Sequence, residues 1–158
     1  MKTGGSATGL PGRLRATCVR AARWLRRIAG GQRQAPTPET ELGQKGERTA
    51  ARFLRRQGYR VLERNFRCTA GEIDLVVFRD GVIAFVEVRS RMAPAQVDPM
   101  STVTRSKQQR LIRAAHRYAA LHNLHREDVV LRFDVVAVLF DVGGRPNDVR
   151  HVENAFQL

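Results

Sequence analysis

The chain has 158 residues and is strongly basic, with 28 lysines and arginines against 15 aspartates and glutamates, a formal net charge of +13. This length suits one domain with its own core, and the excess of positive charge favours polyanionic partners, nucleic acid first and DNA in particular. The two cysteines, Cys18 and Cys68, are too few and too far apart for a zinc cluster or a disulfide framework. No apolar run approaches the roughly 20 residues of a membrane span, so we expect a cytoplasmic protein without a transmembrane segment.

The first 38 residues differ in charge from the remainder of the chain. They carry eight lysines and arginines and no acid, whereas residues 39–158 carry 20 against 15. An apolar helical stripe within this segment comprises Leu14, Cys18, Ala21, Leu25 and Ile28. A membrane-surface helix, a nucleic-acid arm and an organelle transit peptide all share this composition. A wrongly assigned start codon or a disordered extension would also account for it, and we expect residues 1–38 to be a disordered basic extension of a domain over residues 39–158.

The domain should begin with a helix over Leu42–Gln57, ended by Gly58 as a C-terminal cap. Glu47 lies on the apolar stripe of this helix, which continues through Ala50, Ala51 and Leu54. A carboxylate on the buried side of a helix needs a partner, although contact with the helix N-terminus would also account for it. A strand over Arg60–Arg67 follows.

Two apolar strands, Glu72–Phe78 and Val82–Arg89, are joined by Asp80-Gly81, one of the strongest short signals for a β-hairpin. If these two residues form the whole turn, paired positions sum to 161 and Asp74 lies directly opposite Glu87. Like charges so close together are destabilising, which indicates a hard divalent cation between them, Mg²⁺ or Mn²⁺. Two different outcomes stay open. A three-residue loop would slip the register, and Glu87 could simply pair with a nearby arginine.

A second helix should follow a loop over Met92–Val103, with Ser101 or Thr102 as its N-cap and its end near His122. This helix carries a basic stripe, which suits contacts to phosphates but is also typical of a merely solvated face. The stripe consists of Arg110, Arg113 and Arg117, and two more basic residues lie in the first turn of the helix. The candidates for nucleic-acid contacts are therefore Arg105, Lys107, Arg110, Arg113 and Arg117.

A buried strand over Leu131–Phe140, which contains Asp134, and a short strand near Val149–Val152 complete the predicted domain. The order is helix, three strands, helix, strand. A meander followed by a helix that returns a strand to the sheet predicts an α/β fold, a central mixed β-sheet flanked by helices.

Five short motifs recur in order along the domain: Leu42–Glu47, Gly71–Leu75, Phe85–Arg89, Val103–Lys107 and Arg132–Val136. Together they resemble the bacterial YraN-like family of uncharacterised proteins, a branch of the restriction-endonuclease-like PD-(D/E)-x-K nucleases related to archaeal Holliday-junction resolvases. The resemblance covers about residues 40–155 and leaves the basic extension outside. It implies a restriction-endonuclease-like fold with an α-β-β-β-α-β core.

The same resemblance implies that Asp74 and Glu87 are ligands of Mg²⁺ or Mn²⁺ and that Glu47 is a supporting acid near the metal. Arg89 stands where the nuclease motif carries lysine. Arginine stays protonated in proteins, so Arg89 can hold the attacking water or stabilise developing charge but cannot act as a general base.

The implied activity is metal-assisted hydrolysis of phosphodiester bonds in structured DNA or RNA. The alternative is a non-catalytic nucleic-acid-binding or protein-interaction module that keeps the nuclease fold. A junction resolvase would be expected to act as a homodimer.

Overall fold

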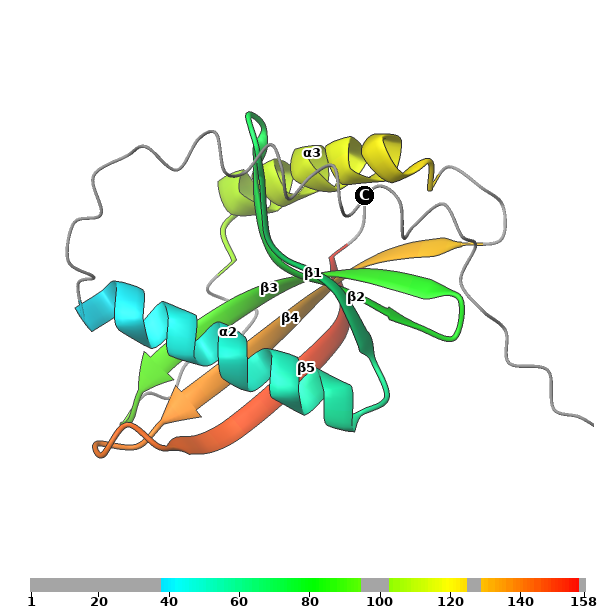
Figure 1. Cartoon of the computed structure of the whole chain (residues 1–158). Coiled ribbons are helices and arrows are strands. Elements are labelled where there is room, and N and C mark those ends of the chain that lie inside the picture. The colour runs from blue at the N-terminus through cyan, green and yellow to red at the C-terminus, as the bar shows by residue number, and fades with distance from the viewer. Residues whose placement is uncertain (1–37, 95–102, 125–128, 157–158) are drawn as a thin grey trace, which may run out of the picture. The chain divides into compact units, whose positions relative to one another are not determined.

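A computed structural model describes residues 38–94, 103–124 and 129–156 of the chain, which form two helices and five strands (Figure 1). In chain order the elements are α2 (Pro38–Arg56), β1 (Arg60–Cys68), β2 (Gly71–Arg79), β3 (Val82–Met92), α3 (Arg105–His122), β4 (Val130–Phe140) and β5 (Pro146–Phe156). The predicted order of helices and strands is confirmed, and the expected short last strand is the long strand β5.

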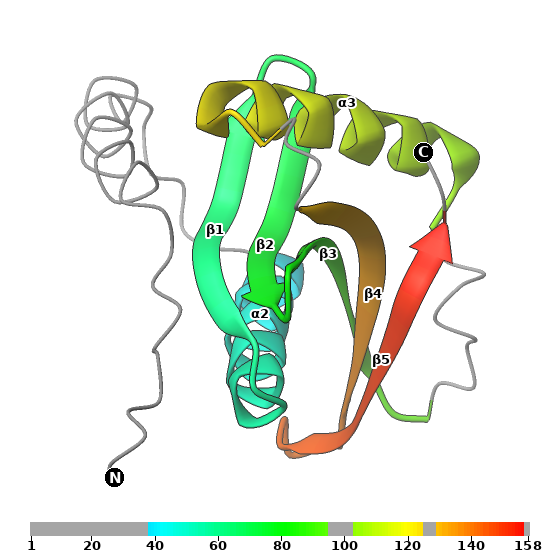
Figure 2. The ribbon, with the colours of Figure 1, turned by 90° about the vertical axis from the view of Figure 1, so that its right-hand side faces the viewer.

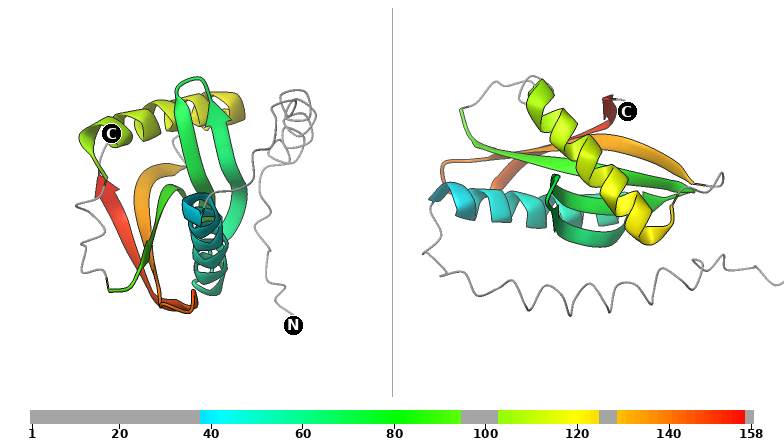
Figure 3. Two further views of the ribbon diagram at one scale, coloured as in Figure 1. Left: turned by 90° about the vertical axis from the view of Figure 1, so that its left-hand side faces the viewer. Right: turned by 90° about the horizontal axis from the view of Figure 1, so that it is seen from above.

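The strands form one sheet in chain order, β1-β2-β3-β4-β5. Neighbouring strands are antiparallel except β3 and β4, which run parallel. Parallel strands need a crossover connection, and α3 lies in that connection, covering one face of the sheet while α2 covers the other (Figure 3). The sheet is therefore mixed and flanked by helices, as predicted, and is consistent with a restriction-endonuclease-like α/β fold.

Each face of the sheet carries its own hydrophobic core. Leu111 and Tyr118 of α3 pack in a cluster with Phe85 of β3, whereas Leu54 of α2 packs in a cluster with Val86. Phe85 and Val86 are consecutive, so their side chains point to opposite faces of the sheet. Both are nevertheless buried. The apolar run of β3 thus belongs to a strand that is covered on both faces.

Both helices begin at positions other than those predicted. α2 begins at Pro38, ahead of the expected Leu42, and Gly58 after its end has a φ of +86°, which fits the expected cap. α3 begins later than expected, because Thr104, rather than Ser101 or Thr102, is its N-cap. The Thr104 hydroxyl accepts a hydrogen bond from the Lys107 N–H at 3.3 Å, which fixes the first turn of α3.

The last strand is longer than the predicted Val149–Val152, because β5 pairs with β4 from Pro146 through to Phe156. The predicted basic extension, apart from Pro38, and most of the predicted loop over Met92–Val103 lie outside the described residues. Neither described helix combines the length and the apolar character that crossing a membrane requires.

The β2–β3 hairpin has the predicted two-residue turn, with positive φ at both Asp80 and Gly81. Its register also follows the predicted sum, from Arg79↔Val82 to Leu75↔Val86. Within the described residues the β2–β3 ladder ends there, while β2 continues to pair with β1 as far as Gly71. The outer ends of β1 and β2 therefore leave β3 and run up to α3, so that the sheet opens between β2 and β3 (Figure 2).

Candidate active site

A cavity between α2 and β3, beside the point where β2 leaves β3, holds the residues that the sequence singles out for catalysis. It has a volume of about 420 Å³ and is lined by Glu47, Asp74, Glu87 and Arg89 among its wall residues. Glu47 comes from α2, Asp74 from β2, and the other two from β3. The fold thus brings together four side chains that are up to 42 positions apart in the sequence.

Asp74 and Glu87 were predicted to be direct partners in the ladder, and the structure corrects this in one respect. The ladder of described residues ends one pair earlier, at Leu75↔Val86, because β2 turns away toward α3. Asp74 instead accepts a hydrogen bond at Oδ2 from the Val88 N–H at 2.7 Å. The carboxylate takes the place of the main-chain acceptor that a continued ladder would supply, and it remains beside Glu87.

Glu87 is the most deeply buried acid of this group, with 3% of its side chain exposed. Its Oε1 faces two cations, Lys107 Nζ at 3.3 Å and Arg89 Nη2 at 3.5 Å. Its Oε2 is buried and accepts no hydrogen bond from any described residue. An unsatisfied buried carboxylate oxygen is unfavourable, so this atom is available to a ligand that enters the cavity.

The electrostatics of the pair follow from this burial. Burial raises the pKa of Asp74 from its ordinary 3.8 to about 7, with further upward contributions from the charges of Glu87 and Glu47, while the Val88 hydrogen bond and Lys107 act against the shift. Burial also raises the pKa of Glu87, opposed by Lys107 and Arg89. Both carboxyl groups therefore hold their protons more tightly than usual, and a bound cation would favour their ionised forms.

The donor set fits a hard divalent ion with few protein ligands. Among the described residues, no three carboxylate, imidazole or thiol groups lie close enough together to enclose a metal ion by themselves. Mg²⁺ commonly keeps several waters and takes only one or two carboxylates from the protein. Asp74 and Glu87, with Glu47 on the same cavity wall, meet that requirement.

Lys107 occupies a different place from the one predicted for it. It was predicted to contact nucleic acid from the first turn of its helix, but its Nζ lies 3.3 Å from Glu87 Oε1 and 3.9 Å from Glu72 Oε1, inside the carboxylate cluster. The sequence offered one hint, because Lys107 was expected in the first turn of the helix, apart from the stripe of arginines that follows. The other four nucleic-acid-binding candidates, Arg105, Arg110, Arg113 and Arg117, are exposed on α3.

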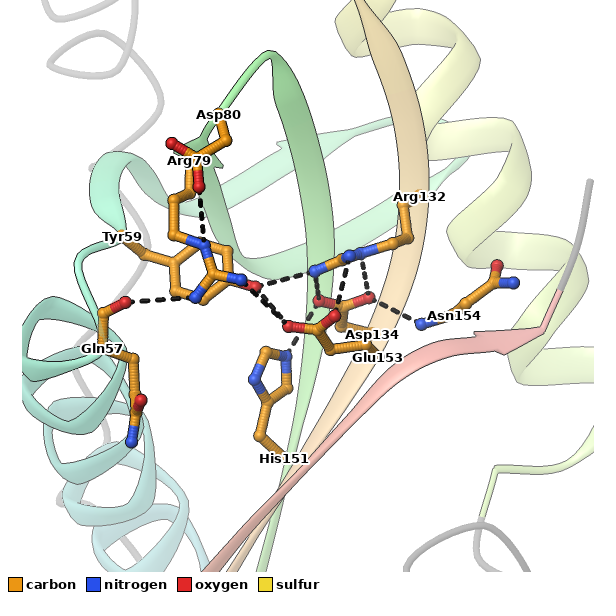
Figure 4. Close-up of polar contacts among 9 residues, drawn as sticks. All are labelled: Gln57, Tyr59, Arg79, Asp80, Arg132, Asp134, His151, Glu153 and Asn154. Carbon is orange, nitrogen blue, oxygen red and sulfur yellow. Dashed lines mark hydrogen bonds and ion pairs between the residues drawn. The ribbon is translucent and has the colours of Figure 1, made fainter.

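A second polar cluster joins β4 to β5 and was not predicted (Figure 4). Asp134 is completely buried and binds Arg132 Nε at 2.9 Å, His151 Nε2 at 2.8 Å and the Asn154 N–H at 3.0 Å. Burial alone would raise the pKa of Asp134, but these hydrogen bonds from His151, Asn154 and Arg132 bring it below its ordinary value. Glu153 of the same cluster accepts hydrogen bonds from Tyr59 and Arg132. With its partners supplied by the protein, the cluster ties the sheet together rather than awaiting a ligand.

The region that contains this site also decides the family. The sequence model of the uncharacterised protein family UPF0102 matches residues 46–138, which include Glu47, Asp74, Glu87, Arg89 and Lys107. The chain belongs to UPF0102. This confirms the resemblance to the YraN-like proteins and leaves the activity of the family open.

UPF0102 relatives match over most of their length. A UPF0102 protein of Pelobacter propionicus is 39% identical over 141 residues, 85% of this chain and 99% of the relative. One from Alkalilimnicola ehrlichii is 49% identical over 122 residues, 77% of this chain and 93% of the relative. One from Myxococcus xanthus is 43% identical over 126 residues, 79% and 96% of the two chains.

Proposed function

We propose that this protein is a metal-dependent nuclease that hydrolyses phosphodiester bonds in structured DNA or RNA. The observation that carries the proposal is the cavity between α2 and β3, where Glu87 presents a buried Oε2 that has no hydrogen-bond partner among the described residues. Asp74 beside it has a pKa raised to about 7 by burial and by its acidic neighbours. Such a pair is suited to holding a hard divalent cation.

Each side chain has a separate part in this reaction. Asp74 and Glu87 would hold Mg²⁺ or Mn²⁺, with Glu47 as the supporting acid. When bound, the ion polarises the phosphate and lowers the pKa of its water. Arg89 would stabilise the charge that develops on the phosphate. Because arginine stays protonated in proteins, Arg89 would not accept a proton. Lys107 would hold the Glu87 carboxylate in place through its 3.3 Å ion pair.

Lys107 also bears on the absence of a lysine at position 89. The nuclease motif places its lysine on the strand, whereas this chain brings an ammonium to the same carboxylate from α3. A lysine therefore lies beside the candidate metal ligands although the motif position holds Arg89. This arrangement supports a catalytic protein over one that has lost its active site.

The second candidate function is a non-catalytic nucleic-acid-binding module that keeps the fold. Arg89 favours it, because arginine cannot replace a lysine that acts through its neutral amine. The two functions differ in outcome, since the module should bind nucleic acid with or without a divalent ion and leave every phosphodiester intact.

The test is cleavage of branched, flapped and single-stranded substrates with Mg²⁺ and with Mn²⁺. Asp74→Asn and Glu87→Gln should each abolish cleavage while leaving nucleic-acid binding intact or stronger, because both remove negative charge near the phosphate. Asp148→Asn is the matched control, since Asp148 pairs with Arg150 on β5 and does not belong to the cavity of described residues around Glu87. If the wild type cleaves none of these substrates with either metal, the binding module is the better explanation.

A further inference from the structure

A second cavity adjoins the candidate active site at the β1–β2 turn. It has a volume of about 370 Å³ and is lined by Arg67, Cys68, Gly71, Glu72, Lys107 and Arg110. Three of these side chains are positively charged and one is negatively charged, so the cavity is basic in balance. Nothing in the proposed function uses Arg67 or Arg110.

Lys107 connects the two cavities. Its Nζ lies 3.3 Å from Glu87 Oε1 in the candidate active site and 3.9 Å from Glu72 Oε1 in the basic cavity. A polyanion with phosphates at regular spacing that entered the active site would therefore meet the basic cavity next. An isolated anion would occupy only one of the two cavities, so the presence of both suits a polyanion better.

The walls of the basic cavity are held in place by a close contact between the turn and the helix. A Cβ at Gly71 would lie 2.9 Å from the carbonyl oxygen of Arg110, so the turn rests directly on the α3 backbone. The Cys68 thiol also contacts the Gly71 carbonyl at 3.5 Å. The cationic side chains thus project from a fixed backbone, which reduces the ordering needed when a ligand binds.

Glu72 forms weak ion pairs with two cations of this cavity. Its Oε2 lies 3.4 Å from Arg67 Nε, and its Oε1 lies at the longer 3.9 Å from Lys107 Nζ. The Glu72 side chain is 49% exposed, and ion pairs of this kind contribute little. A phosphate can form shorter, charge-assisted hydrogen bonds with the same cations and displace Glu72 from them.

We propose that this basic cavity binds the nucleic-acid phosphate next to the one that is cleaved, an inference that rests on the proposed nuclease function. Arg67 and Arg110 supply the planar donors suited to phosphate, and Lys107 lies between the two phosphates. Glu72 pairs with Arg67 and Lys107 in the empty cavity, and the phosphate takes its place beside these cations.

The experiment uses the full chain in a metal-free buffer, so that no cleavage takes place. Binding of inorganic phosphate is followed by ¹H–¹⁵N NMR shifts, and binding of a short single-stranded DNA by fluorescence anisotropy over a range of salt concentrations. Arg67→Ala combined with Arg110→Ala should abolish the phosphate-induced shifts around Gly71 and reduce the salt slope of binding to single-stranded DNA by about 0.7 for each phosphate that the variant no longer binds. The matched control combines Arg52→Ala with Arg56→Ala, which removes the same charge from exposed positions of α2 that are not among the residues lining this cavity in the described structure.

Glu72→Gln provides a test that misfolding cannot imitate, because it predicts a gain. Removing this carboxylate should strengthen phosphate and DNA binding several-fold, more than Asp148→Asn, which makes the same change in net charge on β5. The proposal is overturned if both arginine pairs weaken binding equally, or if Glu72→Gln does no more than Asp148→Asn. It is also overturned if Glu72→Gln strengthens phosphate binding but not DNA binding, since the cavity would then be a small-anion site. Absence of cleavage with Mg²⁺, together with the expected binding results, would remove the nuclease function and retain the cavity as part of a binding module.

Discussion

Asp74→Asn should stabilise the metal-free protein, and the gain should depend on pH. The pKa of Asp74 is raised from 3.8 to about 7, mainly by burial and by Glu87. Between these two values the folded state binds more protons than the unfolded state, so the free energy of unfolding falls as pH rises through this window and is level above it. Asparagine keeps a side-chain oxygen for the Val88 N–H but carries no charge.

The size of the effect follows from the width of the window. One pH unit corresponds to about 1.4 kcal/mol, so the interval between 3.8 and about 7 gives an upper limit of about 4 kcal/mol for the wild-type protein above pH 7. The buried amide of asparagine keeps some desolvation penalty, and we therefore expect a gain of about 2–4 kcal/mol near pH 8. For a domain of this size, that is on the order of 10 °C in Tm.

The assay is urea denaturation in the presence of a chelator, at several pH values from about 5 to about 8. The difference between Asp74→Asn and wild type should be largest near pH 8 and shrink steadily as the pH falls. Addition of Mg²⁺ near pH 8 should stabilise the wild type, because a ligand that binds only the folded state raises its stability, and should have less effect on the variant. Asp148→Asn serves as the control. A variant that is no more stable than wild type near pH 8, or a difference that does not change with pH, would show that Asp74 is not strained by its neighbours.

Three further predictions concern other parts of the fold. Lys107→Met should weaken Mg²⁺-dependent stabilisation, since without the ammonium the pKa of Glu87 rises further, and Lys107→Arg should restore part of it; thermal melts over a Mg²⁺ series measure both. Gly46→Ala should destabilise by about 1–3 kcal/mol, because its Cβ would collide with the Ser90 hydroxyl, and adding Ser90→Ala should recover part of that loss in a double-mutant cycle. Asp134→Ala should cost about 3–5 kcal/mol in urea denaturation, since it leaves buried partners unpaired. The pKa of Asp134 is lowered from its ordinary 3.8. The contribution of its charge to the free energy of unfolding is therefore complete well above pH 3.8 and is lost as the pH falls below that value.

The features that were predicted from the sequence are those set by local chemistry. The Asp80-Gly81 turn fixes the register of the β2–β3 hairpin, and register decides which side chains share a face. Period alone placed Glu47 on the apolar stripe of its helix, and it lines the cavity as the stripe suggested. Both inferences use only residues within a few positions of one another.

The features that were missed depend on contacts between distant segments. Lys107 reaches Glu87 because the β1–β2 turn rests on α3, and no periodicity reveals how a helix is rotated against a hairpin. The early end of the β2–β3 ladder has the same origin, since β2 leaves β3 to meet α3 while it stays paired with β1. Asp134 was visible as an acid in an apolar strand, but two of its three partners, His151 and Asn154, come from β5, whose extent was underestimated.

The way in which α3 completes the site has a consequence for the order of folding. Glu47, Asp74, Glu87 and Arg89 all lie within α2 and the β1–β2–β3 meander, whereas Lys107 belongs to the crossover helix. Contacts between near segments form faster than those that close a long connection. The acids can therefore gather before their main counter-charge arrives, and their repulsion should retard compaction above neutral pH more than below it. Docking of α3 then both relieves that repulsion and brings Lys107 to the carboxylates, so the last step of folding is also the step that completes the charge balance of the site.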